Sequence, residues 1–231
     1  MWLKNRSVQR LGGGRLEHWG LSLWSKLQFQ ALQSRKDGAT VKLLRDVRKE
    51  RNSLLSAFEA LHIFSFAMAM GPMPGDMAEV GTYQGASAKV ICEVKGAKTL
   101  RVFDTFEGLP KGAAQDNGVH REGAYACSLE SVKGYLAGYE NVEFYKGLFP
   151  ASAVDAPEAK YCFAHFDVDL YEGTLGCLEY FYPRMVPGGI MVSHDYSLLA
   201  GVEAAFTEFF ADKPEPVIDL PTTQCMVVKL A

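Results

Sequence analysis

The fold is decided by the stretch Met77-Ala78-Glu79-Val80-Gly81-Thr82-Tyr83-Gln84-Gly85-Ala86-Ser87. A short apolar run leads into a glycine-containing loop, and a helical pattern follows over Ala86–Val94. We predict a strand over Met77–Val80, a tight turn at Gly81, and a helix whose first N–H groups are unpaired. Such a helix start favours a bound anion such as a carboxylate.

Further strands and helices alternate along the rest of the chain. Strands are predicted at Thr99–Phe103, Asn141–Tyr145, Tyr161–Phe166, Ile190–Ser193, Val217–Leu220 and Gln224–Leu230, and helices at Glu172–Tyr182 and Gly201–Phe210. This alternation predicts a doubly wound α/β fold with a mostly parallel, seven-stranded sheet and helices on both faces. The last two strands have no helix between them, which suits an antiparallel addition at one edge.

The first 70 residues have a different pattern. Gly12-Gly13-Gly14 breaks any structure there, Leu21–Ser34 is predicted as a short amphipathic helix, and apolar residues recur at helical spacing from Val41 to Met70. The run Gly71-Pro72-Met73-Pro74-Gly75 ends that helix. We therefore predict a helical extension or lid over residues 1–70 and an α/β domain over residues 71–231. Residues 112–135 are glycine-rich and polar, and we expect a loop and a short helix over the site.

Composition restricts the class of protein. Of the 231 residues, 48% are hydrophobic and 22% charged, which suits a globular domain with one sizeable core. No apolar run reaches the ~20 residues that a membrane-spanning helix needs, and no secretory signal is recognisable. The five cysteines are scattered without a CxxC pair, which argues against a disulfide framework or zinc ribbon and favours the cytoplasm.

The charge is unevenly distributed. Residues 1–51 contain twelve Lys/Arg and four Asp/Glu, although the whole chain has a net charge of −3. A solvated helix face, docked on the acidic body, explains this basic arm most simply; an anionic substrate or an acidic neighbouring subunit would also fit. Nucleic acid is disfavoured because the arm does not interleave aromatic and basic residues. The apolar Val41–Met70 segment could be core or the surface of a homo-oligomer.

An acidic residue follows the second predicted strand. Asp104 comes directly after Val102-Phe103, where a carboxylate can accept two hydrogen bonds from ribose hydroxyls. The loop Gly81–Gly85 has the spacing G-x-x-x-G and lacks the G-x-G-x-x-G pattern that binds a pyrophosphate, so a dinucleotide is disfavoured. Together the loop and Asp104 predict a nucleoside cofactor.

Four motifs in the same order resemble a known enzyme family. They are Glu79–Ser87, Phe103-Asp104-Thr105-Phe106-Glu107-Gly108-Leu109-Pro110, Phe166-Asp167-Val168-Asp169-Leu170-Tyr171-Glu172-Gly173-Thr174, and Tyr182-Pro183 followed by Pro187-Gly188-Gly189 and Asp195-Tyr196. The first is similar to catechol O-methyltransferase, and the set as a whole resembles the macrocin O-methyltransferase family. That resemblance covers residues 74–196, over half the chain, and implies a class I, Rossmann-like methyltransferase that uses S-adenosylmethionine.

The resemblance also implies which residues bind the cofactor. It assigns Glu79, Gly81, Tyr83 and Ser87 to the methionine end, Asp104 to the ribose, and Phe106, Gly147 and Phe149 to the surroundings of the adenosine; Gly85 and Asp167 complete the predicted cofactor-binding residues.

Acidic residues and a histidine follow two further strands. Asp167 and Asp169 come after the fourth strand and His194 and Asp195 after the fifth, and adjacent strand ends lie roughly 5 Å apart. Asp167, His194 and Asp195 are therefore predicted as ligands of a divalent metal, and the resemblance, which implies Mg²⁺, supports this. The family pattern has two acids before the tyrosine, whereas this chain has His194, which shifts the preference towards Mn²⁺ or another transition metal.

Each of these residues has an alternative interpretation. His194 or Asp167 could be a general base without a metal, Asp169 could cap the helix that begins near Tyr171, and His120 could reach over the site. His165, inside a predicted strand, is interpreted as a packing residue. We predict a metal-assisted O-methyltransferase that acts on the hydroxyl of a small molecule, a sugar or a phenol, with Asp167 and His194 as catalytic residues. A metal-independent methyltransferase, an iron-dependent hydroxylase on the same fold, and a cofactor-binding protein without catalysis are the alternatives.

Overall fold

One sheet organises the molecule. The computed structural model describes residues 15–51 and 53–231, with side chains from residue 23 onward. Within them, seven strands are arranged in the order β3-β2-β1-β4-β5-β7-β6. The strands are β1 Asp76–Val80, β2 Leu100–Asp104, β3 Val142–Lys146, β4 Tyr161–Phe166, β5 Met185–Ser193, β6 Ile218–Asp219 and β7 Cys225–Val228. Strands β1 to β5 are parallel, β7 pairs antiparallel with β5, and β6 pairs antiparallel with β7 at the edge. The doubly wound α/β fold predicted from the sequence is confirmed.

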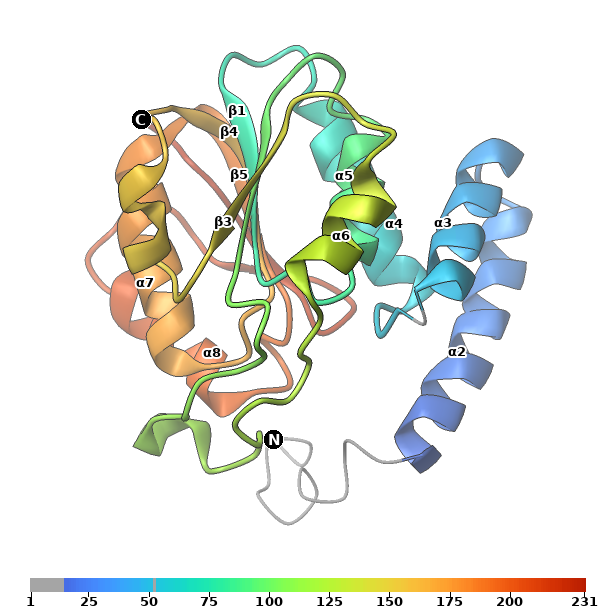
Figure 1. The fold of residues 1–231 in the computed structure, drawn as a ribbon, viewed down its shortest axis with the longest axis horizontal. Helices are drawn as coiled ribbons and strands as arrows, with labels where there is room; N and C mark the ends of the chain where they lie inside the picture. The colour runs from blue at the N-terminus through green and yellow to red at the C-terminus, as the bar shows by residue number, and fades with distance from the viewer. Residues whose placement is uncertain (1–14, 52) are drawn as a thin grey trace.

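Helices cover both faces of this sheet (Figure 1). Helices α4, α5 and α6 lie on one face and α7 and α8 on the other, while α2 and α3 pack outside α4 and α5. Their bounds are α2 Arg15–Gln33, α3 Gly38–Glu50, α4 Ala57–Ala69, α5 Ala86–Cys92, α6 Leu129–Leu136, α7 Tyr171–Phe181 and α8 Ala200–Phe209, with short 3₁₀ turns at Ala114–Asp116, Ala151–Asp155 and Tyr182–Arg184. All six residues of β4 are buried, as expected for a central parallel strand covered on both sides.

The structure corrects the prediction of one helical segment over Val41–Met70. Two helices form instead, α3 and α4, and the connector between them includes residues 51 and 53–56. Ser56 begins α4 with a capping box, because its hydroxyl accepts from the Glu59 N–H while the Glu59 carboxylate accepts from the Ser56 N–H. The Arg48 guanidinium donates to the carbonyls of Ser53 and Leu55 and so stabilises the connector.

Other boundaries differ by a few residues. Helix α2 begins at Arg15, six residues before the predicted Leu21, and the predicted break at Gly12-Gly13-Gly14 lies outside the described residues. Strand β5 begins at Met185 rather than Ile190, because the strand continues through Pro187–Gly189 with an irregular register against β4. None of the helices in the described ranges combines the length and the apolar character that crossing a membrane requires.

Candidate functional site

The predicted site residues form one row across the sheet. Val80 is in register with Phe103 of β2 and with Phe166 of β4, and Phe166 is in register with Ser193 of β5. The next residue along the chain after each of these four positions lies at the carboxyl edge of the sheet. These next residues are Gly81, Asp104, Asp167 and His194. The backbone ladder continues into the row, since Asp167 N–H donates to the Val80 carbonyl and His194 N–H to the Phe166 carbonyl, both at 2.9 Å. Parallel pairing therefore brings together residues that lie up to 113 positions apart.

A cavity of about 690 Å³ lies above this row. Of the predicted site residues, those on its wall are Gly81, Tyr83, Ser87, Asp104, Gly147, Phe149, Asp167, His194 and Asp195. The wall also includes Asp169, His120 of the predicted lid loop, and residues 51 and 53–55, from the connector between α3 and α4. This volume is within the range of small-molecule and cofactor sites.

Gly81 and Gly85 shape the loop between β1 and α5. Gly81 has φ +79°, and a Cβ there would lie 1.9 Å from the carbonyl oxygen of Asp167, so the two strand ends meet through backbone alone. Gly85 has φ +83° and is the N-cap of α5, where a Cβ would meet Val132 at 3.1 Å. Gly85 thus lies behind the cavity wall and closes the loop on α6.

The Asp104 carboxylate orders the same loop. One of its oxygens accepts from the N–H groups of Thr82 (2.7 Å) and Tyr83 (3.1 Å), and the other accepts from the Phe106 N–H at 2.7 Å. Burial raises the pKa of Asp104 above its usual value, although these three N–H groups oppose the shift. Phe106 is buried and does not line the cavity. The assignment of Asp104 to a ribose stays a prediction.

Glu79 lies beneath the loop rather than in the cavity. Its side chain is fully buried and one carboxylate oxygen lies 3.0 Å from Nδ1 of His165, its in-register neighbour on β4. The other oxygen of Glu79 and Nε2 of His165 have no hydrogen-bond partner among the described residues. The interpretation of His165 as a packing residue therefore omitted its pairing with Glu79.

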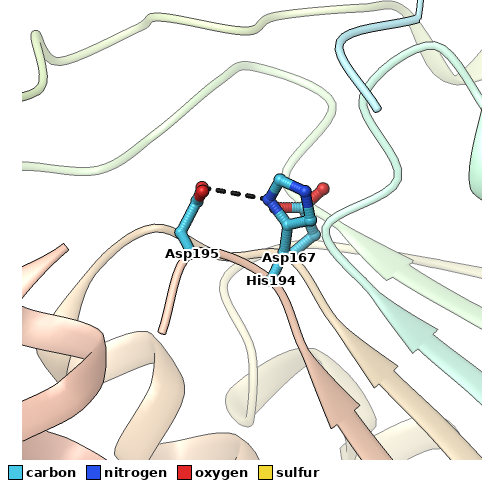
Figure 2. Close-up of side chains that lie close together, drawn as sticks. All are labelled: Asp167, His194 and Asp195. Carbon is cyan, nitrogen blue, oxygen red and sulfur yellow. Dashed lines mark ion pairs between the residues drawn. The ribbon is translucent and has the colours of Figure 1, made fainter. Parts of the chain in front are cut away.

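A compact group lies at the carboxyl edge of β4 and β5, which we call the rim, and consists of Asp167, His194 and Asp195 (Figure 2). One ligand atom from each lies within 4.8 Å of the others. Nδ1 of His194 is 3.1 Å from Oδ2 of Asp195 and 3.5 Å from Oδ1 of Asp167. Two carboxylates and one imidazole fit a divalent cation, and the imidazole suits a transition metal better than Mg²⁺.

The charges at this rim depend strongly on one another. Burial would lower the pKa of His194, but Asp195, Asp167 and Glu59 outweigh it and raise this pKa well above its usual value. Asp169 hydrogen-bonds with Asp195, and burial together with the neighbouring carboxylates raises the pKa of Asp169 well above its usual value. Burial and Asp195 also raise the pKa of Asp167, against the attraction of His194. A cation bound here would relieve the repulsion among these carboxylates.

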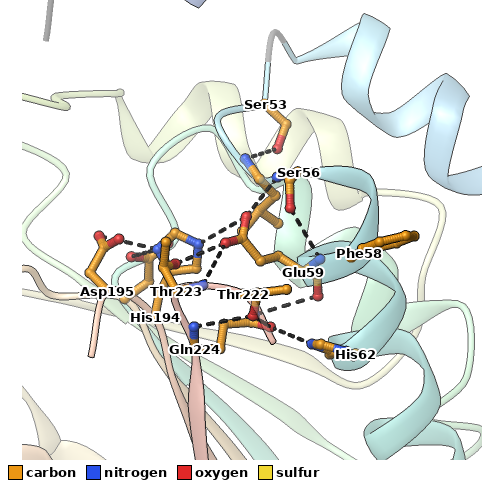
Figure 3. Close-up of polar contacts among 12 residues, drawn as sticks. Ser53, Ser56, Phe58, Glu59, His62, His194, Asp195, Thr222, Thr223 and Gln224 are labelled. Atoms are coloured by element: carbon orange, nitrogen blue, oxygen red, sulfur yellow. Dashed lines mark hydrogen bonds and ion pairs between the residues drawn. The ribbon is translucent and has the colours of Figure 1, made fainter. Parts of the chain in front are cut away.

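Glu59 is part of the site and was missed by the sequence analysis (Figure 3). It lies on the first turn of α4, and its Oε2 is 3.4 Å from Nε2 of His194. The capping box Ser56-x-x-Glu59 signals the start of a helix. Nothing in that motif indicates that the helix starts at the carboxyl edge of a sheet formed by much later residues.

Asp116 is a second residue that the sequence analysis missed. Its Oδ1 accepts from the Tyr171 N–H at the start of α7, and its Oδ2 accepts from the Ala113 N–H, both at 2.7 Å. The suggestion that Asp169 caps this helix is wrong, since the N-cap is Leu170 and Asp116 supplies the acceptor. Asp116 thus attaches the loop over the cavity to α7.

Comparisons with known proteins identify the family of the chain. A model of the macrocin-O-methyltransferase (TylF) family matches residues 58–225, more than half of the chain. The match begins inside α4, next to Glu59, and extends to the first residue of β7.

Two curated relatives are named as O-methyltransferases. An 8-demethyl-8-(2,3-dimethoxy-alpha-L-rhamnosyl)-tetracenomycin-C 4'-O-methyltransferase of Streptomyces olivaceus is 32% identical over 142 residues, 54% of this chain and 54% of the relative. A demethyldecarbamoylnovobiocin O-methyltransferase of Streptomyces niveus is 30% identical over 60% of this chain and 59% of the relative. The matched region thus spans little more than half the length of these relatives.

The fold is also shared with a solved structure. The O-methyltransferase NovP superimposes with a TM-score of 0.69 at 24% identity, over 78% of this chain and 82% of that chain. At this identity the likeness concerns the fold.

Proposed function

Since the chain belongs to the macrocin O-methyltransferase (TylF) family, we propose that it transfers the methyl group of S-adenosylmethionine to a hydroxyl group of a small molecule. The observation that carries this proposal is the row Gly81, Asp104, Asp167 and His194, which lines one cavity at the carboxyl edge of the sheet. A nucleoside cofactor and its acceptor can bind side by side in such a cavity.

The cofactor would bind along the β1 and β2 side of the cavity. The loop from Gly81 to Tyr83 and the hydroxyl of Ser87 would hold the methionine end near the start of α5. Asp104 would accept from the ribose, and Gly147 and Phe149 would contact the adenosine. Glu79, fully buried beneath the loop, would support it from below through its pairing with His165.

The acceptor would bind on the β4 and β5 side. A sugar hydroxyl of a natural product is the acceptor class that we favour, because both curated relatives are named as O-methyltransferases of tetracenomycin or novobiocin compounds, one of them rhamnosyl-substituted. Specificity would come from His120 and the loop held by Asp116, together with the connector between α3 and α4, which also lines the cavity. Residues 15–70 would then act as part of the site wall.

The chemistry is an in-line displacement at the methyl carbon. The acceptor oxygen forms a bond to this carbon as the carbon–sulfur bond breaks, sulfur keeps the electron pair, and the hydroxyl proton is released to water. Holding the two reactants in line lowers the activation free energy by roughly several kcal/mol. Asp167, His194 and Asp195 would hold a divalent ion, which when bound lowers the pKa of the acceptor hydroxyl and orients it.

The five cysteines are free in the structure, and four of them are buried. Unpaired cysteines suit a reducing compartment, so we place the protein in the cytoplasm as part of this proposal.

The test is transfer of a labelled methyl group to a panel of deoxysugar glycosides and phenols, with calorimetry of S-adenosylmethionine binding. We expect binding together with transfer to at least one sugar hydroxyl. Binding without transfer across the panel would indicate a cofactor-binding protein without catalysis. Transfer that survives exhaustive chelation would indicate a metal-independent reaction, and oxygen consumption with Fe²⁺ in place of transfer would indicate a hydroxylase.

A further inference from the structure

The two ring nitrogens of His194 face carboxylates on opposite sides. Nδ1 faces Asp195 and Asp167, at 3.1 and 3.5 Å, and Nε2 faces Glu59 at 3.4 Å. The His194 side chain is 12% exposed and Glu59 7%, so this contact is almost shielded from water. The ring is therefore held between Asp167 and Asp195 on one side and helix α4 on the other. Together with His194, these two aspartates are the ion-binding group of the proposed function.

Glu59 is itself held in place by the N-cap of α4 and by the turn that precedes β7 (Figure 3). Its Oε2 accepts from the Ser56 N–H at 2.8 Å, and its Oε1 accepts from the hydroxyl of Thr223 at 2.8 Å and from the Thr223 N–H at 3.3 Å. The Gln224 side chain donates to the Glu59 carbonyl. The carboxylate cannot swing towards Asp167 without breaking these bonds, so Glu59 remains beside His194 and outside the ion-binding group.

A histidine that binds a metal through one nitrogen usually donates its other N–H to a carboxylate. That donation fixes the tautomer and leaves the lone pair of the first nitrogen free for the ion. The arrangement here approaches this form: Nε2 lies 3.4 Å from Oε2 of the buried Glu59, within ion-pair distance but without a hydrogen bond of normal geometry among the described residues, and Nδ1 faces Asp167 and Asp195.

We propose that Glu59 is a positioning residue that fixes the Nε2–H tautomer of His194, so that Nδ1, Asp167 and Asp195 together prefer a transition-metal ion over Mg²⁺. This inference rests on the proposed function only in taking these three residues as an ion site. It explains how the chain accommodates a histidine where the family pattern has an acid: the structure supplies a carboxylate behind the ring. It also makes the start of α4 part of the ion site.

The experiment compares the binding of Co²⁺, Zn²⁺ and Mg²⁺ to the full chain by calorimetry. We expect the wild-type protein to bind Co²⁺ more tightly than Mg²⁺, and Glu59→Gln to weaken Co²⁺ binding about 10- to 100-fold. Glu172→Gln is the matched control, because it removes the same charge from the wall of the same cavity, and among the described residues Glu172 forms no ion pair or hydrogen bond with His194. We expect it to change Co²⁺ binding by less than about threefold, as a screened charge would.

A spectroscopic readout separates positioning from general loss of charge. In the Zn²⁺-loaded protein, ¹⁵N NMR of the His194 ring should show a proton on Nε2 and the metal on Nδ1. The absorption bands of bound Co²⁺ should shift in His194→Asp, a variant that restores an all-carboxylate set and should narrow the difference between Co²⁺ and Mg²⁺ affinity. This variant keeps the proposal testable if Glu59→Gln weakens the cap of α4 enough to prevent folding.

Three results would overturn the inference: a wild-type preference for Mg²⁺, a metal-bound Nε2, or equal losses in Glu59→Gln and Glu172→Gln. Methyl transfer by a protein that binds none of these ions would remove the inference and leave the proposed function standing. Binding of Co²⁺ through Nδ1 without any methyl transfer would support the inference and contradict the proposed function.

Discussion

Two histidines of this protein each face a glutamate, yet they lie in different surroundings. His165 is inside β4, fully buried, and contacts Glu79 on the neighbouring strand at 3.0 Å. His194 is one residue beyond β5 and lies close to three carboxylates, Asp195, Asp167 and Glu59. In the interior of the sheet, a side chain pairs with its neighbour in register. At the rim, a side chain is contacted by loop residues and by the start of a helix.

The difference predicts where each histidine matters. The interior pair is shielded from water and from the cavity, so breaking it should appear in the free energy of unfolding. The rim group lines the cavity, so changing it should appear in ligand binding and turnover. If variants of both groups changed stability and turnover alike, this distinction between the two histidines would be wrong.

The largest effect is expected for Asp167→Asn. If an ion held by Asp167 assists the reaction, its loss removes several kcal/mol, so kcat should fall about 10²- to 10³-fold. Steady-state kinetics and metal calorimetry on an identified acceptor measure this. Asp212→Asn, which removes an exposed carboxylate paired with Lys213, is the control and should be silent. Wild-type turnover together with wild-type metal affinity in Asp167→Asn would exclude the metal mechanism.

The next effect concerns the interior pair. His165→Leu leaves the Glu79 carboxylate buried without its partner and should lower the free energy of unfolding by about 3 kcal/mol. Urea denaturation measures this. The double variant Glu79→Leu/His165→Leu should recover part of the loss, because no unpaired polar group then remains. A loss below about 1 kcal/mol in the single variant would show that the pair is not energetically coupled.

Gly81→Ala tests how closely the rim is packed. Its Cβ would lie 1.9 Å from the Asp167 carbonyl oxygen, so β1 and β4 would have to separate at their ends. Gly96→Ala is the control: Gly96 has φ +61° and nothing within 4 Å of its Cβ position, so it pays only the backbone cost of about 1–2 kcal/mol. We expect Gly81→Ala to lose about 2 kcal/mol more than this control and to weaken S-adenosylmethionine binding. Equal losses measured by denaturation would mean that the rim adjusts freely.

The sequence was sufficient to predict the row of site residues because that row depends on local patterns. Each strand end is marked by an apolar run that stops at a glycine or an acid, as at Gly81, Asp104 and Asp167. Parallel pairing then places these ends at one edge of the sheet, whatever lies between them. The fold class and the convergence of Asp167, His194 and Asp195 follow from that rule, and both agree with the structure.

Other features depend on packing that local patterns do not describe. Glu59 contacts Thr223, 164 positions later, because the start of α4 lies beside the turn that precedes β7. The division of Val41–Met70 into two helices was readable from the capping box of Ser56 and Glu59, but the apolar spacing on both sides outweighed it. Asp116 lies in a polar loop where any of several residues could have capped α7.

The smallest effect concerns Asp116, a carboxylate on the cavity wall that is not part of the group Asp167, His194 and Asp195. Its two oxygens accept from different N–H groups, those of Tyr171 and Ala113, and Asp116→Asn retains only one acceptor oxygen. We expect a local loss of about 1 kcal/mol, seen as faster amide exchange of Ala113 or Tyr171, with exchange in β4 around His165 unchanged. Asp37→Asn is the matched control, because the N–H and hydroxyl of Thr40 both use one oxygen of Asp37, and asparagine caps a helix as well as aspartate. If exchange in β4 also increased in Asp116→Asn, the rim and the interior of the sheet would be one cooperative unit, and the separation between His194 and His165 would be wrong.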